Sequence, residues 1–228
     1  LLFPLLPMMN TDLRNSPPEN EAAKLVVSWQ LDELKGHITR LYGSEQLELA
    51  RPCIRSVVDR QIYASIHYRD AQTKVNSYLA AEFQHDSMLE DIFEDQESWG
   101  RFNFFIREVA AHLTACVQSM HAVPDIMAHV VYYGLGFNRL STPLKSRDVG
   151  VKSVLKLLKR DTGLSTLHSL LEKFADDDNF VYLSALANQA KHRSIIFPEL
   201  SEDWTGKRAD CHTIMFPAFS FEGIQHPQ

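Results

Sequence analysis

The chain has 228 residues, of which 45% are hydrophobic and 23% are charged, and its formal net charge is −6. These proportions exclude the disordered, collagen-like and low-complexity classes and predict a globular protein. The negative charge opposes unaided adhesion to nucleic acid or to an anionic membrane, so a polyanionic partner would have to meet a local basic patch. The three cysteines lie far apart without a CxxC pair, which predicts a reducing, cytoplasmic location and argues against a cysteine-ligated zinc site.

The chain begins with an apolar run, LLFPLLPMM, which two prolines interrupt. The run is about half as long as the ~20 residues of a membrane-spanning helix, and no positively charged region precedes it as in a signal peptide. We therefore expect no membrane partner. We also expect residues 1–15 to form a disordered or extended segment, with the folded region beginning near Ser16.

Two helices are predicted in the first third of the chain. Residues 16–19 are typical of a helix start, with a hydroxyl cap, prolines in the first turn and a glutamate after them. An apolar stripe then leads to Gly43, which is expected to end the helix. The stripe consists of Val27, Leu31, Leu34, Ile38 and Leu41. A second helix is expected after Pro52, because apolar residues recur at every fourth position from 54 to 66.

The strongest periodic signal extends from about residue 99 to residue 135. Apolar residues alternate here at spacings of three and four, which predicts the central helix of a bundle. They are Ile106, Val109, Leu113, Cys116, Met120, Val123, Met127 and Val130. Pro124 lies inside the pattern and is expected to kink the helix or to split it in two. The acidic stretch 86–97 before it predicts a solvated helix face or a connecting turn.

Shorter elements are predicted in the rest of the chain. Helices are expected at 151–158, at 165–174 and from the Asp triplet 176–178 to about Arg193. A loop is expected over residues 134–145, and Asp148 is the expected cap of the helix that follows it. Residues 194–197 and 213–221 are β-branched and aromatic with turn formers between them, which predicts strands.

Together these patterns predict a mainly α fold, a bundle of five to seven helices with a small C-terminal β-hairpin. The bundle is expected to occupy residues 16–193, and residues 194–228 are expected to form a hairpin or small sheet packed on it. No internal repeat and no Gly/Ser linker divides the chain, so a single domain is expected.

The sequence lacks the glycine-rich, nucleophile-elbow and metalloprotease signatures, so no cofactor is expected. The first candidate site is instead a group of polar residues near the end of the last predicted helix. Asn188 and His192 are four residues apart and therefore share a helical face, which Ser184 extends by one turn. Lys191 and Arg193 flank the imidazole, so a general acid or base lies beside two phosphate-binding cations, an arrangement suited to RNA cleavage. The alternative is that these cations only meet the negative end of the helix dipole.

The segment Ala187-Asn188-Gln189-Ala190-Lys191-His192, late in a helical chain, resembles the motif of HEPN-domain proteins. Members of this family carry an arginine, then a polar residue, then a histidine on a helix of a four- or five-helix bundle. The resemblance includes the preceding long helix with its segments Ser119-Met120-His121 and Asp125-Ile126-Met127-Ala128. It implies a bacterial homo-oligomer related to metal-independent RNases, with RNA and a partner protein or antitoxin as candidate partners.

Carried over to this chain, the resemblance makes His192 the catalytic acid or base and Asn188 its orienting partner. Lys191 and Arg193 are then the candidate phosphate contacts. Ala187 stands where the family places its arginine, so the RNase site is expected to be degenerate or inactive. An active version would cleave RNA by attack of the 2′-hydroxyl group without a metal or a cofactor.

A second polar group is formed by His121, Asp125 and His129, which lie in one stripe of a single helix. These residue types bind metal ions, but residues eight apart are about 12 Å apart along a helix. One ion could contact only adjacent members, with His112 and His168 as further donors. An outward polar face and a hydrogen-bonded seam between helices are the alternatives to this weak metal candidate.

A basic strip on the predicted helix 151–158 and its end could also touch RNA, although a solvated helix face is the favoured explanation. The strip comprises Lys152, Lys156, Lys159 and Arg160. Aromatic residues that could stack on RNA bases are not identifiable from the sequence. A non-enzymatic interaction or structural protein is the second functional reading, and a metal-binding helical bundle is the third.

Overall fold

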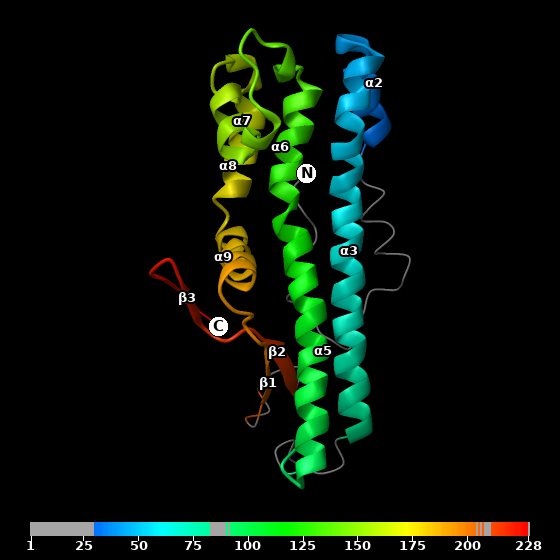
Figure 1. The fold of residues 1–228 in the computed structure, drawn as a ribbon, viewed down its shortest axis with the longest axis vertical. Coiled ribbons are helices and arrows are strands. Elements are labelled where there is room, and N and C mark those ends of the chain that lie inside the picture. The colour runs from blue at the N-terminus through cyan, green and yellow to red at the C-terminus, as the bar shows by residue number, and fades with distance from the viewer. Residues whose placement is uncertain are drawn as a thin grey trace. The chain divides into compact units, whose positions relative to one another are not determined.

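The computed structural model describes residues 30–82, 90, 92–203, 205, 207 and 211–227. This part of the chain is mainly α-helical and ends in small antiparallel β-hairpins, which confirms the predicted fold class (Figure 1). The helices are α2 (Leu31–Tyr42), α3 (Ser44–Glu82), α5 (Gln96–His121), α6 (Val123–Gly134), α7 (Val151–Leu158), α8 (Ser165–Ala175) and α9 (Asp178–His192). The strands are β1 (Glu199–Glu202), β2 (His212–Met215), β3 (Phe219–Phe221) and β4 (Ile224–His226). Each described helix is too short or too polar to traverse a lipid bilayer.

Contacts divide the described residues into two compact units. The first unit contains residues 30–63 and Ser119–Val181, and the second contains the described residues of Ala64–Gln118 and 182–227. The predicted boundary at residue 193 stays a prediction. The expected N-terminal segment 1–15 and the helix start at Ser16 lie outside the described residues.

The first unit has an apolar core made of two clusters. One cluster joins α6, α7 and α8 and includes the fully buried side chains of Val154 and Leu158. The other joins α2, the beginning of α3 and α6, and includes Ile38 and Val57. Because Ile38 belongs to the apolar stripe of α2, the amphipathic pattern of the sequence accounts for the face that this helix buries.

Gln46 is a buried polar residue in this core, with 2% of its surface exposed. Its Nε2 donates to the carbonyl of Tyr133 at 2.6 Å and to Oδ1 of Asn138 at 2.7 Å. Its Oε1 accepts from Nδ2 of Asn138 at 3.2 Å. The buried amide therefore has partners on both of its polar atoms and holds the beginning of α3 against the turn that follows α6.

Helix α3 begins at Ser44 and continues through Pro52, so the prediction of a helix that starts only after Pro52 was wrong. A proline inside a helix costs about 3 kcal/mol and leaves one carbonyl without its partner. Pro52 is exposed, so this occurs at a solvent-facing turn. Leu47 and Ala50 pack in the cluster around Ile38, and this burial offsets the cost.

The predicted helix 99–135 is two helices, α5 and α6, separated at Ala122. Pro124 lies in the first turn of α6, where its missing N–H removes no hydrogen bond, so the expected split is confirmed. Helix α5 begins before residue 99, because the carboxylate of Asp95 accepts the backbone N–H of Ser98 at 2.7 Å. This hydrogen bond lowers the pKa of Asp95. Residues 86–89 and 91 of the acidic stretch 86–97 lie outside the described residues.

The starts of α7 and α9 are held by different hydrogen bonds. Helix α7 is preceded by Gly150 rather than capped by Asp148, because Ser153 Oγ accepts the N–H of Gly150 at 2.9 Å and donates to the Asp148 carbonyl at 2.8 Å. At α9 the Asp triplet acts as expected. The carboxylate of Asp177 accepts the N–H of Asn179 at 3.0 Å, which satisfies a donor that the helix start leaves free.

In the second unit, α3 and α5 run antiparallel. Lys74 pairs with Glu108, and Glu82 pairs with Arg101, so residue numbers fall along α5 as they rise along α3. An apolar cluster between the two helices contains Ala71, Val75, Phe105 and Val109, with Leu200 of β1 and Ile214 of β2 packed on it. This cluster fixes the axial register that brings polar side chains of the two helices together.

The C-terminal strands are shorter than predicted. Strand β1 pairs with β2, and β3 pairs with β4, both in antiparallel register. Residues 194–197 form no strand, so the strand predicted there was wrong. Residues 216–218 separate β2 from β3, so the predicted strand region 213–221 is interrupted. The β-branched run after α9 remains largely exposed, with Ile195 at 49% and Phe197 at 45%. A β-branched segment forms a strand only where a neighbouring strand is available to pair with it, and β-propensity does not supply that neighbour.

Candidate functional site

The end of α9 carries the residues that resemble the HEPN motif. Asn188 is half-buried, and its Nδ2 lies 3.5 Å from Oγ of Ser184, so these two residues meet along the helix as the spacing predicts. His192 is the last residue of α9 and is exposed, as are Lys191 and Arg193. The structure therefore presents the imidazole and both flanking cations at one end of the helix.

Ala187, one residue before Asn188, lies on the packed side of α9. It is completely buried, and Leu183 and Leu186 of the same helix are also buried, with 7% and 4% of their surface exposed. An arginine at this position would have to place a guanidinium in an apolar environment without a counter-ion, which is strongly unfavourable. The burial of Ala187 gives a physical reason for the absence of the arginine that the HEPN motif would have there.

Two arginine–phenylalanine pairs lie around the segment that follows α9. The guanidinium of Arg193 is 5.1 Å from the ring centroid of Phe221, and that of Arg107 is 5.9 Å from the ring centroid of Phe197. These distances are within the range of cation–π interactions. The sequence could not identify these aromatic residues, because the pairs join α5 and the hairpins to residues close to α9.

The stripe of His121, Asp125 and His129 does not converge on one point. Nδ1 of His129 donates to the backbone carbonyl of Asp125 at 2.9 Å, which leaves the carboxylate outside this contact. The ring of His121 stacks near Phe180, with centroids 6.4 Å apart and an angle of 11°. His121 is the last residue of α5, whereas Asp125 and His129 lie in α6, so the prediction of one stripe on a single helix was wrong.

The other cationic and histidine candidates of the first unit also have local surroundings. The basic strip of α7 is exposed on the side opposite the buried residues Val154, Leu157 and Leu158. His168 lies 3.7 Å from Glu172, one turn further along α8. The exposed strip agrees with a solvated helix face, whereas the side chain of His168 is only 17% exposed.

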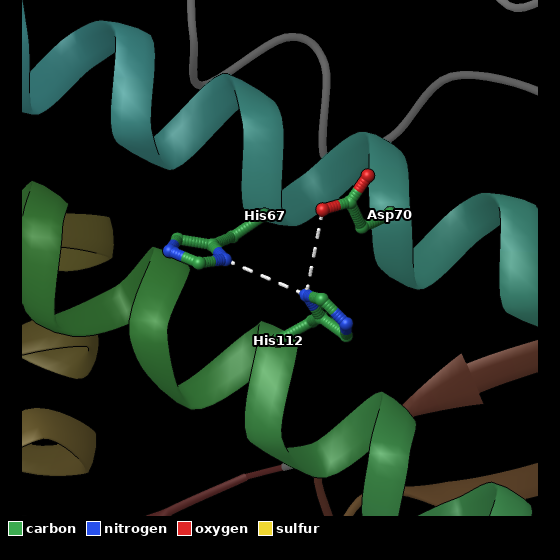
Figure 2. A group of neighbouring side chains, drawn as sticks. All are labelled: His67, Asp70 and His112. Carbon is green, nitrogen blue, oxygen red and sulfur yellow. Dashed lines mark hydrogen bonds and ion pairs between the residues drawn. The ribbon is translucent and has the colours of Figure 1, made fainter.

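A different group of polar side chains converges in the second unit. His67 and Asp70 lie on one face of α3, and His112 faces them from α5 (Figure 2). The two Nδ1 atoms of the histidines are 3.4 Å apart, and Nδ1 of His112 is 3.7 Å from Oδ2 of Asp70. The side chain of His112 is 25% exposed and that of Asp70 is 49% exposed, so solvent reaches the group.

Of these three residues, only His112 was predicted as a metal donor, as one of two further donors beside the stripe of His121, Asp125 and His129. His67 and Asp70 are three residues apart, a spacing that places two side chains on one helical face. That spacing was the available signal. The partner on α5 is 45 residues away from His67, and its proximity depends on how the two helices align along their axes.

A second convergent group lies in the β1–β2 hairpin and contains Glu202, Cys211 and His212. The antiparallel register places Glu202 opposite His212, with 3.8 Å between Oε1 and Nε2. Another thiol of this unit, Cys116, is buried in α5, and this burial raises its pKa to about 12. Cys116 therefore stays protonated at neutral pH and is excluded as a nucleophile there.

Comparisons with known proteins give no match: no family model fits the sequence, and no curated protein or solved structure is significantly similar to the chain.

Proposed function

We propose that the protein is an HEPN-like helical protein that associates with single-stranded RNA through the C-terminal end of α9. In this proposal its metal-independent RNase site is degenerate. The observation that supports it is the exposed group Lys191, His192 and Arg193, with arginine–phenylalanine pairs beside it.

The surroundings of this end of α9 supply both components of single-strand binding. Cations bind the phosphate backbone, and aromatic rings stack on bases without sequence preference. Phe197 is 45% exposed, so a base can reach its ring. Because the chain as a whole carries a charge of −6, a local cationic group is the feature that RNA association requires.

The degenerate character of the RNase site follows from Ala187. Phosphoryl transfer depends on cations that stabilise the charge of the transition state. His192 remains available as an acid or base, and Asn188 is held by Ser184, but the family's arginine position is buried and apolar. Association with RNA is therefore proposed without efficient cleavage.

The remaining parts of the proposal are a bacterial cytoplasmic location, a homo-oligomeric state and a partner protein or antitoxin. They derive from the HEPN resemblance. The exposed Ile195 and Phe197 support a protein contact close to the RNA-binding end of α9. A non-enzymatic interaction protein without RNA binding is the alternative that the experiment below tests.

Binding to a labelled single-stranded RNA should be measured by fluorescence anisotropy in EDTA, over a range of salt concentrations. We expect the double variant Lys191→Ala/Arg193→Ala to bind about tenfold more weakly. Its salt slope should be smaller by about 1.4, because each phosphate contact to a single strand contributes ~0.7. The matched control is Lys152→Ala/Lys156→Ala, which removes two exposed cations from α7. Equal losses in both variants, or no binding by the native chain, would contradict RNA association at α9.

A second assay separates binding from cleavage. The RNA should remain intact after long incubation with the native chain in EDTA, and the His192→Ala variant should behave identically. Cleavage that disappears in His192→Ala would show that the RNase site is active. That result would contradict the proposal that the RNase site is degenerate, but it would not contradict RNA association at α9.

A further inference from the structure

We propose that His67, Asp70 and His112 form a binding site for one divalent transition-metal ion, and that Zn²⁺ is the ion that this ligand set suits best. One ligand atom of each residue lies within 4.8 Å of the others, and the side chains point toward a common space between α3 and α5 (Figure 2). The site shares no residue with the end of α9, so metal binding here can be tested independently of RNA association.

The spacing of the ligand atoms suits a tetrahedral ion. Zn²⁺ binds imidazole nitrogen at ~2.0–2.1 Å, which places two ligands of a tetrahedron about 3.3 Å apart. The two histidine Nδ1 atoms are 3.4 Å apart, and His112 Nδ1 is 3.7 Å from Asp70 Oδ2. Both distances exceed the ~2.9 Å of a good hydrogen bond. They are closer to the separation of neighbouring ligands around one ion.

Hydrogen bonding alone leaves the group incompletely satisfied. Nδ1 of His112 faces both His67 and Asp70, yet a ring nitrogen has either one hydrogen or one lone pair in its plane. It can therefore serve one neighbour well and not both. An ion placed between the three residues accepts a lone pair from each, and the carboxylate offsets one of its two charges.

The neighbouring residues are compatible with ion entry. The group is accessible to solvent, because Asp70 is 49% exposed and His112 is 25% exposed. Lys74, one turn after Asp70, is held 2.8 Å from Glu108, so its positive charge is largely neutralised by a partner. Three protein ligands leave a coordination position for water, as in zinc sites that are not closed by a fourth side chain.

The ligand types also define the class of ion. Two imidazole nitrogens and one carboxylate suit Zn²⁺, Co²⁺, Ni²⁺ or Fe²⁺, whereas Mg²⁺ and Ca²⁺ prefer oxygen ligands only. Co²⁺ is therefore a useful spectroscopic probe for the same site. Its absorption spectrum reports tetrahedral geometry and distinguishes nitrogen and oxygen ligands from a thiolate.

The full-length chain, freed of metal with a chelator, should be titrated with ZnCl₂ by calorimetry and with CoCl₂ by absorption. We expect one ion per chain and a loss of affinity of at least about tenfold in His67→Ala and in His112→Ala, since even the loss of a residue that only orients a ligand weakens metal binding 10–100-fold. Matched controls are His129→Ala and Cys211→Ser, which should bind as the native chain does. Circular dichroism checks that each variant is folded, and His112→Gln replaces His112→Ala if the latter is not.

Three results would overturn the proposal. The first is the absence of Zn²⁺ binding by the native chain. The second is unchanged affinity in both His67→Ala and His112→Ala. The third is loss of the ion in Cys211→Ser together with a thiolate absorption band for Co²⁺, because this would place the ion at the group in the β1–β2 hairpin.

Discussion

The two compact units use their polar side chains in different ways. In the first unit, His129 bonds to the backbone carbonyl of Asp125 in its own helix, and Gln46 has partners on both of its polar atoms inside an apolar core. In the second unit, polar side chains of α3 meet those of α5 across the helix pair. We call this set the polar seam, and it comprises His67, Asp70, Lys74 and Glu82 of α3 with Arg101, Glu108 and His112 of α5.

The difference shows where a ligand can bind. A histidine whose ring nitrogen bonds to its own helix has only its other ring nitrogen for a ligand. Residues eight apart in one helical stripe are about 12 Å apart along the axis, so they do not converge on one ligand. Side chains from two antiparallel helices converge on the space between them, as His67, Asp70 and His112 do. The comparison predicts that stability depends mainly on the apolar clusters, and that the polar seam contributes more to binding than to folding.

The largest effect is expected in the core of the first unit. Leu158 is completely buried among α6, α7 and α8, so Leu158→Ala should lower the free energy of unfolding by about 3 kcal/mol through lost burial and the cavity left behind. The measurement is urea denaturation followed by circular dichroism. Leu170→Ala in α8 is the control, since this side chain is 44% exposed and should change stability by less than about 1 kcal/mol. Similar losses for both variants would contradict the assignment of this core.

The next effect tests the buried amide of the first unit. Gln46→Leu removes one donor from the Tyr133 carbonyl, which keeps the N–H of Gly136 at 3.1 Å, and leaves the amide oxygen and nitrogen of Asn138 without their bonds to Gln46. We expect a loss of about 2 kcal/mol in the free energy of unfolding. Glu45→Ala, at an exposed position of the same helical turn, should change it by no more than about 0.5 kcal/mol. A neutral result for Gln46→Leu would mean that the amide does not tie α3 to the turn after α6.

Much of this architecture could be predicted from the sequence, because its signals are local. The apolar stripe ending at Gly43 predicted α2, Pro124 predicted the break between α5 and α6, and the Asp triplet predicted the start of α9. Local rules failed where packing overrides them. Pro52 lies inside α3 because Leu47 and Ala50, in the turn before it, pack in the apolar cluster around Ile38.

The candidate sites also differ in how far the sequence predicts them, because one is local to a helix and the other depends on packing between helices. The line of Ser184, Asn188 and His192 is a property of one helix, so spacing was sufficient to place it. The contact between His67 and His112 joins residues 45 positions apart, and it depends on the axial register that the apolar cluster of α3 and α5 sets. Periodicity gives the face of a helix but not its alignment with a neighbour.

A third prediction concerns the buried thiol of the second unit. Burial raises the pKa of Cys116 from 9.0 to about 12, so the folded state keeps a proton that the unfolded chain loses. The resulting stability is fully present below about pH 9 and is lost as the pH rises toward about 12, at about 1.4 kcal/mol per pH unit. Unfolding by urea at pH 8 and at pH 10 should show a smaller decrease in Cys116→Ala than in the native chain. Cys211→Ser, at an exposed position, should retain the full decrease.

The smallest effect is expected in the polar seam itself. Lys74 and Glu108 are 33% and 40% exposed, so their ion pair at 2.8 Å is screened by water and should contribute about 0.2–1 kcal/mol. A double-mutant cycle with Lys74→Met and Glu108→Gln, measured by urea denaturation, isolates this coupling. In the metal-free protein, His112→Ala should be similarly mild, because the side chain fills no apolar core. A coupling well above 1 kcal/mol would show that the seam stabilises the helix pair. A small coupling, together with Zn²⁺ affinity that depends on His112, would assign the polar seam to ligand binding. The helices α3 and α5 would then pack through Val75, Phe105 and Val109 whether or not the polar groups of the seam are intact.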